Sequence, residues 1–176
     1  MSRTLETRNG IVILRQVVTE DIPAFREMRL EALRLHPEAF GADYQQSEQQ
    51  PQEYWLQRLA SNPYRTTFVA EADGQLIGMT GVLRGEMPKT AHTATIISVY
   101  VRSGWRGLHL IDALIEECLN WSREKSIRVV KLAVVANNTP AIRSYIRCGF
   151  SVYGVEPESL CVDGRYHDEL LMVRRL

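Results

Sequence analysis

Apolar positions along the chain recur with two different spacings, and each spacing predicts one kind of element. Four apolar residues over 11–14 follow the turn signal Asn9-Gly10 and predict a first short strand. Apolar residues then recur at i, i+3 and i+4 over 22–36, which predicts a first helix with Thr19 as its N-cap. The polar residues 1–10 carry no such pattern, so they are expected to form a frayed leader.

A polar segment separates the first helix from the next apolar pattern. Residues 37–52 are polar with interspersed aromatic and acidic side chains, which favours a loop over a site, although a plain surface connection accounts for the same composition. The elements expected next are a short helix from Tyr54 to about Asn62, strands at 66–71 and 75–84 around the Asp73-Gly74 turn, and a long strand at 91–101. This part of the sheet is therefore predicted to be antiparallel.

The transition from strand to helix within residues 95–120 carries the first chemical signal. An apolar run rich in β-branched residues ends at Arg106-Gly107, and a helical apolar pattern starts directly after it. A strand that enters a helix through such a turn directs unpaired N–H groups and the positive end of the helix dipole to one point, which suits a phosphate. Taken alone, the stretch is equally compatible with Arg106 as a solvated surface charge and Gly107 as an ordinary turn residue.

The remaining pattern predicts a parallel crossover and then a capped helix. Residues 110–121 form an amphipathic stripe and the apolar segment 129–136 resembles a central strand, so strand, helix and strand form a βαβ unit. Thr139 is the expected cap of the next helix, because Pro140 suits its first position and Gly149 stops it. The last strands are expected at 150–155 and 170–174, joined through 157–168.

Length and composition indicate one domain without an overall charge. The 176 residues are 45% hydrophobic and 24% charged, and Lys+Arg and Asp+Glu both number 21, which gives a pI of about 6.9. One α/β domain over residues 1–176 is expected, with no global field that attracts nucleic acid or an anionic membrane. The first residues lack a signal-peptide core and no apolar run has the length of a membrane span, so a cytoplasmic protein is expected.

Cysteine and histidine positions give no metal or disulfide signature. Cys118, Cys148 and Cys161 include no C-x-x-C pair, and the four histidines lack i,i+4 spacing. Neither a metal nor a disulfide is expected. The anion-binding turn is therefore the strongest chemical signal that the spacing of residues provides.

Two separated motifs coincide with this order of elements. Residues 106–111 read Arg-Gly-Leu-His-Leu-Ile after a strand, and the capped helix carries Asn138-x-x-Ala141-x-x-x-Tyr145-x-x-x-Gly149-Phe150. Over about residues 11–175 the chain resembles the GCN5-related N-acetyltransferase (GNAT) family, in which R/Q-x-x-G-x-G/A opens the helix that holds the pyrophosphate of acetyl-CoA. The second motif matches the family pattern at each of its named positions.

The resemblance implies an α/β fold and a specific reaction. The expected sheet is mixed, mostly antiparallel, of about six or seven strands, splayed in the middle, with about four helices on its two faces. The expected reaction is transfer of the acetyl group of acetyl-CoA to a primary amine, by direct attack of the neutral amine on the thioester.

The resemblance also assigns residues to the expected acetyltransferase. The pantetheine arm is expected to run along the backbone near Val99 and Val101, where the sheet splays. Asn138 would contact this arm and Tyr145 would protonate the departing thiolate, a general-acid effect of about 10²–10⁴-fold. An ordinary turn asparagine and an ordinary helix tyrosine are the alternatives. The complete set expected to bind acetyl-CoA is Val99, Val101, Arg106, Gly107, Leu108, His109, Leu110, Ile111, Asn138 and Ala141.

The sequence departs from the family pattern in two respects. His109 and Ile111 stand where the family has glycine and glycine or alanine, and a β-branched isoleucine adds bulk that would weaken pyrophosphate binding if it faces the site. The strand at 91–101 also lacks the Glu that many relatives use as a base. The titratable residues considered for that role are Glu71, Glu86, His92, His167 and Asp168, and the sequence does not choose among them.

Two functions of different classes fit these residues. The leading one is an acetyltransferase for a small-molecule or peptide-terminal amine, and acidic residues Glu38, Asp43 and Glu48 in the 37–52 segment motivate a cationic acceptor. The alternative is a non-catalytic acyl-CoA-binding protein with a degenerate pyrophosphate loop, which His109 and Ile111 motivate. Nucleic-acid binding is a distant third, and a homodimer is expected from family analogy only.

Overall fold

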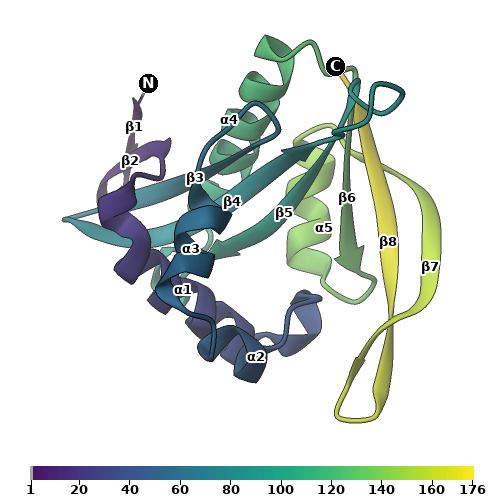
Figure 1. Cartoon of the computed structure of the whole chain (residues 1–176), viewed down its shortest axis with the longest axis horizontal. Coiled ribbons are helices and arrows are strands. Elements are labelled where there is room, and N and C mark those ends of the chain that lie inside the picture. The colour runs from purple at the N-terminus through teal and green to yellow at the C-terminus, as the bar shows by residue number, and fades with distance from the viewer. Residues whose placement is uncertain (1) are drawn as a thin grey trace.

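The computed structural model describes residues 2–176, which form one mixed sheet with helices on both faces (Figure 1). The sheet has 8 strands in the order β1-β2-β3-β4-β5-β6-β8-β7. Every neighbouring pair is antiparallel except β5 and β6. The strands are β1 (Ser2–Thr7), β2 (Gly10–Gln16), β3 (Arg65–Ala72), β4 (Gln75–Arg84), β5 (Thr93–Val101), β6 (Val129–Val135), β7 (Ser151–Val162) and β8 (Arg165–Arg175).

Two hydrophobic clusters occupy the two faces of the sheet. One contains α1 and α3, and the other contains α4 and α5. The alternation of side chains along β3 separates them, because Phe68 and Ala70 belong to the α4 cluster and Val69 to the α1 cluster. The helices are α1 (Ile22–Leu35), α2 (Tyr44–Glu48), α3 (Gln52–Leu59), α4 (Leu110–Glu124) and α5 (Thr139–Arg147). Within residues 2–176 no helix is long and apolar enough to cross a membrane.

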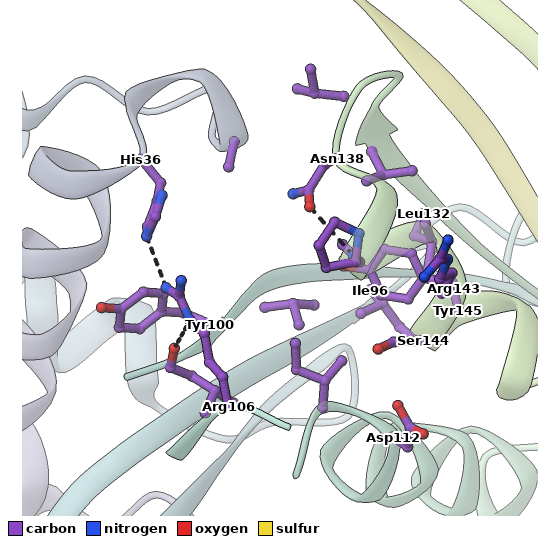
Figure 2. A pocket seen from close by; sticks show the side chains of 18 of the residues that line it. His36, Ile96, Tyr100, Arg106, Asp112, Leu132, Asn138, Arg143, Ser144 and Tyr145 are labelled. Carbon is purple, nitrogen blue, oxygen red and sulfur yellow. Dashed lines mark hydrogen bonds between the residues drawn. The ribbon is translucent and has the colours of Figure 1, made fainter. Parts of the chain in front are cut away.

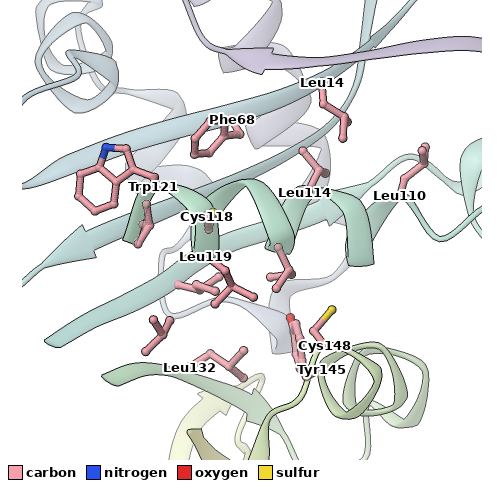
Figure 3. Close-up of a cluster of buried hydrophobic side chains, with 14 of the residues drawn as sticks. Leu14, Phe68, Leu110, Leu114, Cys118, Leu119, Trp121, Leu132, Tyr145 and Cys148 are labelled. Atoms are coloured by element: carbon pink, nitrogen blue, oxygen red, sulfur yellow. The ribbon is translucent and has the colours of Figure 1, made fainter. Parts of the chain in front are cut away.

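Helix α4 is the centre of the larger cluster. Leu114, Ile115, Cys118 and Leu119 recur at helical spacing and are fully buried (Figure 3). Their neighbours come from β2 and β3 on one side and from β6 and α5 on the other, as Leu14, Phe68, Leu132 and Tyr145 show in Figure 3. The helix therefore connects the two halves of the sheet.

The amino-terminal part of the chain differs from the expectation in three respects. Residues 2–7 form β1, which pairs along its whole length with β2, so the frayed leader was wrong for these residues; Met1 lies outside the described residues. Thr19 begins a 3₁₀ turn and Asp21 is the residue before α1, so Thr19 does not cap the helix. The segment 37–52 contains the 3₁₀ turn Pro37–Ala39 and α2, where a loop was predicted.

Two further corrections concern the carboxyl-terminal third. Asn138 is the N-cap of α5, because its side chain accepts a hydrogen bond from Ala141 N, whereas Thr139 is the first helical residue. Strands β7 and β8 continue through the predicted 157–168 connection to the turn at Asp163-Gly164. The pairing of β7 with β8 shifts between Glu156 and Leu160, and this irregularity accommodates Pro157 on an edge strand.

We predict that Leu114→Ala lowers the free energy of unfolding by about 2–5 kcal/mol, because it leaves a cavity where α4 meets the sheet. Chemical denaturation monitored by circular dichroism measures the change. Leu35→Ala is the matched control, since Leu35 is 55% exposed and its truncation should change the free energy by less than about 0.5 kcal/mol. Equal effects of the two substitutions would contradict the proposed role of α4.

An ion-pair network joins β2, β3 and the start of α1. Arg15 donates to Asp21 through Nη1 and Nη2 at 2.6 and 2.8 Å, and through Nε to Glu71 at 2.8 Å. Asp21 also accepts from Val18 N at 2.8 Å. The hydrogen bonds from Arg15 lower the pKa of Asp21 below its usual value, and they outweigh burial, which acts in the opposite direction.

The lowered pKa of Asp21 predicts an acid-sensitive contribution to stability. A carboxyl group whose pKa is lower in the folded protein stabilises it above the unfolded pKa of about 4, and this contribution is lost as pH falls through the folded pKa. Asp21→Asn should therefore lower the free energy of unfolding at pH 7 by about 1–2 kcal/mol and flatten its decrease below pH ~4. Thermal melts between pH 3 and 7 test this, with the exposed neighbour Glu20→Gln as control.

Candidate active site

The site is a cleft that opens where β5 and β6 separate. These strands pair only at Thr93 with Val129, Ala94 with Val130 and Thr95 with Lys131. Beyond these pairs β6 stays with β8 and β5 stays with β4, so the sheet splays as the family resemblance implied. A cleft of about 940 Å³ occupies the gap and is lined by β5, the 105–111 turn, β6, α5 and residues 36–40 (Figure 2).

The turn between β5 and α4 presents unpaired backbone donors to this cleft. Gly107 and His109 both have left-handed φ angles, +75° and +56°, which reverse the chain twice before α4 begins. Within residues 2–176 no hydrogen-bond acceptor of the protein binds the N–H groups of residues 107–112, and the first helical bond runs from Ala113 N to His109 O at 3.1 Å. Unpaired N–H groups at the start of a helix are the kind of donor that binds phosphate groups in proteins.

The side chain of Arg106 does not point toward the turn. It donates through Nε to Val101 O at 3.1 Å, and its Nη2 lies 2.8 Å from His36 Nε2 at the end of α1. Its guanidinium also lies over the ring of Tyr100, 5.9 Å from the centroid (Figure 2). Arg106 therefore connects the turn at residues 105–111, the expected phosphate turn, to β5 and α1, and the unpaired donors of this turn are its backbone N–H groups.

Asp112 in the first turn of α4 is ion-paired with Arg147 and hydrogen-bonded to His109. Arg147 from α5 donates through Nε and Nη2 at 2.8 and 3.0 Å, and His109 Nδ1 lies 3.0 Å from the same carboxylate. Burial opposes ionisation of Asp112, but the hydrogen bonds from Arg147 and His109 outweigh it and hold its pKa below the usual value. The pairing offsets a negative charge that would otherwise repel an anion at this helix start.

Asn138 and Tyr145 occupy the α5 wall of the cleft. Asn138 Oδ1 accepts from Ala141 N at 3.3 Å, and Figure 2 shows its amide nitrogen turned away from α5. Tyr145 is 6% exposed, lines the cleft and packs its ring against Phe150. Burial, followed by the nearby Cys148 thiol, raises the pKa of Tyr145, so its hydroxyl keeps its proton at neutral pH.

The structure brings nearly all the predicted site residues into one cleft. Leu108 is the exception and packs on the other side of the turn. The predicted residues that line the cleft are Tyr145, Asn138, Ala141, Val99, Val101, Arg106, Gly107, His109, Leu110 and Ile111. The residues considered as bases do not line this cleft; they are Glu71, Glu86, His92, His167 and Asp168.

Sequence reasoning missed several residues that line the cleft. These include His36, Tyr100, Asp112, Arg143 and Arg147. Tyr100 comes from β5, Asp112 from α4 and both arginines from α5, within segments that had been identified. Arg143 lies five residues after Asn138 and two before Tyr145, so helical spacing from these two does not identify it, and nothing in the pattern places His36 beside β5.

Comparison with known proteins decides which family this cleft belongs to. The sequence matches the acetyltransferase (GNAT) family over residues 28–150. The chain belongs to the GNAT family. This membership confirms the predicted GNAT fold, the predicted N-acetyltransferase activity and acetyl-CoA as the acyl donor.

Individual GNAT relatives extend over nearly the whole chain. The L-amino acid N-acetyltransferase AaaT of Escherichia coli (strain K12) is 28% identical over 167 residues, 93% of this chain and 97% of that protein. A GCN5-related N-acetyltransferase structure from Kribbella flavida has a TM-score of 0.80 at 26% identity, with 94% of this chain and 98% of that chain covered. The structure of yncA from Salmonella typhimurium with acetyl-CoA has a TM-score of 0.76 at 22% identity, with 94% of both chains covered.

The GNAT phosphate turn contains one bulky residue whose effect can be measured. Ile111 lines the cleft within the row of unpaired N–H groups, where the family has glycine or alanine. We predict that Ile111→Ala lowers the Kd for acetyl-CoA about threefold to tenfold, because a smaller side chain allows closer approach to the backbone donors. Isothermal titration measures this, and Ile146→Ala on the exposed face of α5 is the control. An unchanged or higher Kd would show that Ile111 does not hinder the phosphate.

Proposed function

We propose that this GNAT protein acetylates the primary amine of a small molecule or peptide in the cleft between β5 and β6. The observation that carries the proposal is the convergence of three features in that cleft: the parted strand edge, the unpaired N–H groups of residues 107–112 and the protonated Tyr145. Acetyl-CoA supplies the activated acetyl group as a thioester. The amine acceptor attacks directly, without a covalent intermediate on the protein.

The residues of the turn and of α5 are proposed to hold the acyl donor. Its pyrophosphate is assigned to the N–H groups of residues 107–112, and Arg143 adds positive charge along the same wall. Val101 O already accepts from Arg106, so the backbone at Val99 is the better candidate for the pantetheine arm. The outward-facing amide nitrogen of Asn138 supports contact with the same arm.

Tyr145 is proposed as the general acid. Its raised pKa keeps a proton on Oη, and no protein group within residues 2–176 forms a hydrogen bond with this oxygen. The proton is therefore available to the departing thiolate, which leaves more readily once it is protonated. The alternative is that Tyr145 only packs in the core and does not donate a proton. Removal of its hydroxyl distinguishes these two roles.

The acceptor end of the cleft lies beside residues 36–40. Of the acidic residues that motivated a cationic acceptor, Glu38 lines the cleft, Asp43 caps α2 by accepting from Gln46 N, and Glu48 accepts from Tyr44 Oη. Only Glu38 is thus placed to attract an ammonium group. The name of the Escherichia coli relative, an L-amino acid N-acetyltransferase, supports a small amine. A cytoplasmic location and a homodimer stay predictions.

A protein that binds acyl-CoA without turnover is the second candidate. His109 and Ile111 in the phosphate turn favour it, because they replace residues that allow close approach of the pyrophosphate. Undetectable binding at millimolar acetyl-CoA in isothermal titration would contradict both candidates. Binding without thiol release with any amine would favour the second.

Tyr145→Phe tests the acetyltransferase mechanism directly. We expect kcat to fall about 10²–10⁴-fold with acetyl-CoA affinity nearly unchanged, because the substitution removes only the proton donor. Thiol release measures turnover and isothermal titration measures affinity. Tyr153→Phe removes the same atom from a side chain that is 53% exposed on β7 and should leave both quantities unchanged. A kcat close to that of the wild type would exclude Tyr145 as the acid.

A further inference from the structure

A buried guanidinium lies behind the acceptor wall of the cleft. Arg29 of α1 is 4% exposed, and its Nη1 is buried without a hydrogen-bond partner in residues 2–176. The guanidinium carbon lies 4.5 Å from the centroid of the Phe40 ring, and Phe40 lines the cleft. A buried cation with an unsatisfied donor is costly, so its retention suggests that the charge has a use.

A second guanidinium lies next to the cleft and contacts Ser98 of its wall. Arg58 of α3 donates through Nη1 to Tyr54 Oη at 3.2 Å and through Nη2 to Ser98 Oγ at 3.3 Å. Ser98 lines the cleft and has a φ of +57°, in the part of β5 where pairing with β4 is irregular. This local reversal places the Ser98 hydroxyl, and with it the Arg58 fork, at the α1 side of the parted strands.

No carboxylate balances these two charges. Within residues 2–176 neither Arg29 nor Arg58 has an acidic side chain within 4.0 Å. Glu31, two residues after Arg29 on α1, is instead bound by Tyr100 Oη at 2.8 Å and Arg102 at 3.1 Å. Burial, followed by the charge of Arg58, lowers the pKa of Arg29 to about 10, so Arg29 is still positive at neutral pH. The site therefore combines two unbalanced positive charges with a hydroxyl donor.

We propose that Arg58, with Ser98 beside it and Arg29 behind Phe40, binds a carboxylate on the amine acceptor. The planar fork of an arginine matches the two oxygens of a carboxylate, and Arg29 strengthens the local positive potential without direct contact. Glu38 lies on the same wall and suits the ammonium end of such a molecule. The acceptor class that fits both ends is an amino acid or another small amine with a nearby carboxylate. The inference rests on the proposed acetyltransferase function.

Matched pairs of acceptors test the carboxylate site. Leucine and methionine carry a carboxylate where leucinamide and methioninamide carry a neutral amide, and kcat/KM is measured for each by thiol release. Because the amides have less basic amines, each acceptor is compared between wild-type protein and Arg58→Gln. We expect kcat/KM for the amino acids to fall about 10- to 100-fold and for the amides less than about threefold, because a charged hydrogen bond to the carboxylate is lost.

Control variants separate binding from structure. Arg34→Gln removes an exposed arginine of α1 and should change neither class of acceptor. Arg58→Lys keeps the charge but not the planar fork, so its kcat/KM for the amino acids should fall less than that of Arg58→Gln. Arg29→Met should lower the preference for amino acids if its charge acts on the carboxylate. An unchanged Kd for acetyl-CoA in each variant shows that the fold is intact.

The outcomes distinguish this inference from the proposed function. Turnover of the amides but not of the amino acids by the wild type, or an equal loss for both in Arg58→Gln, overturns the carboxylate site and leaves the acetyltransferase function standing. If none of the amines supports thiol release, the proposed function and this inference are both overturned. Selective loss for the amino acids supports both.

Discussion

Three residue pairs hold β5 and β6 together, and the site depends on where this pairing stops. On either side the sheet is a continuous antiparallel ladder, from β1 to β5 and from β6 to β7, so each half has its own hydrogen bonds. The halves can therefore part beyond Thr95 and Lys131 without weakening either ladder. Helix α4 packs against both halves and keeps them together behind the gap. The result is an unpaired strand edge inside the molecule that lines a cleft and is therefore open to an extended ligand.

The sequence predicted those parts of the fold that local pattern determines. Helices α1 and α4 and strand β6 carry strong periodicity over most of their length, and their identity needs no partner. The polar strand β1 and the far ends of β7 and β8 have no such pattern. They are strands because a neighbouring strand pairs with them, as Ser2–Thr7 does with β2, and pairing between strands is not visible in composition.

The candidate site shows the same division between local and tertiary information. The α5 motif identified Asn138 and Tyr145, since both lie on one helix next to its cap. The roles of Arg29 and Arg58 depend on how α1 and α3 pack against β5, which no spacing along the chain reveals. The acidic residues of the 37–52 segment misled for a related reason: Asp43 and Glu48 serve the local structure of α2. Charge counted along a sequence does not distinguish capping residues from ligand-binding ones.

The backbone of the expected phosphate turn depends little on the side chains of His109 and Ile111. Its donors are backbone N–H groups, whose positions depend on the left-handed angles at residues 107 and 109 more than on side chains. Histidine adopts that angle at a small cost, and its hydrogen bond to Asp112 offsets part of it. Arg106 then fixes the turn to Val101 and His36, so the proposed anion site and the proposed acceptor wall share one anchor. The two ends of the cleft are therefore connected through Arg106. A substitution at Arg106 should disturb both ends, although its side chain forms no hydrogen bond with the N–H groups of the turn or with Arg58.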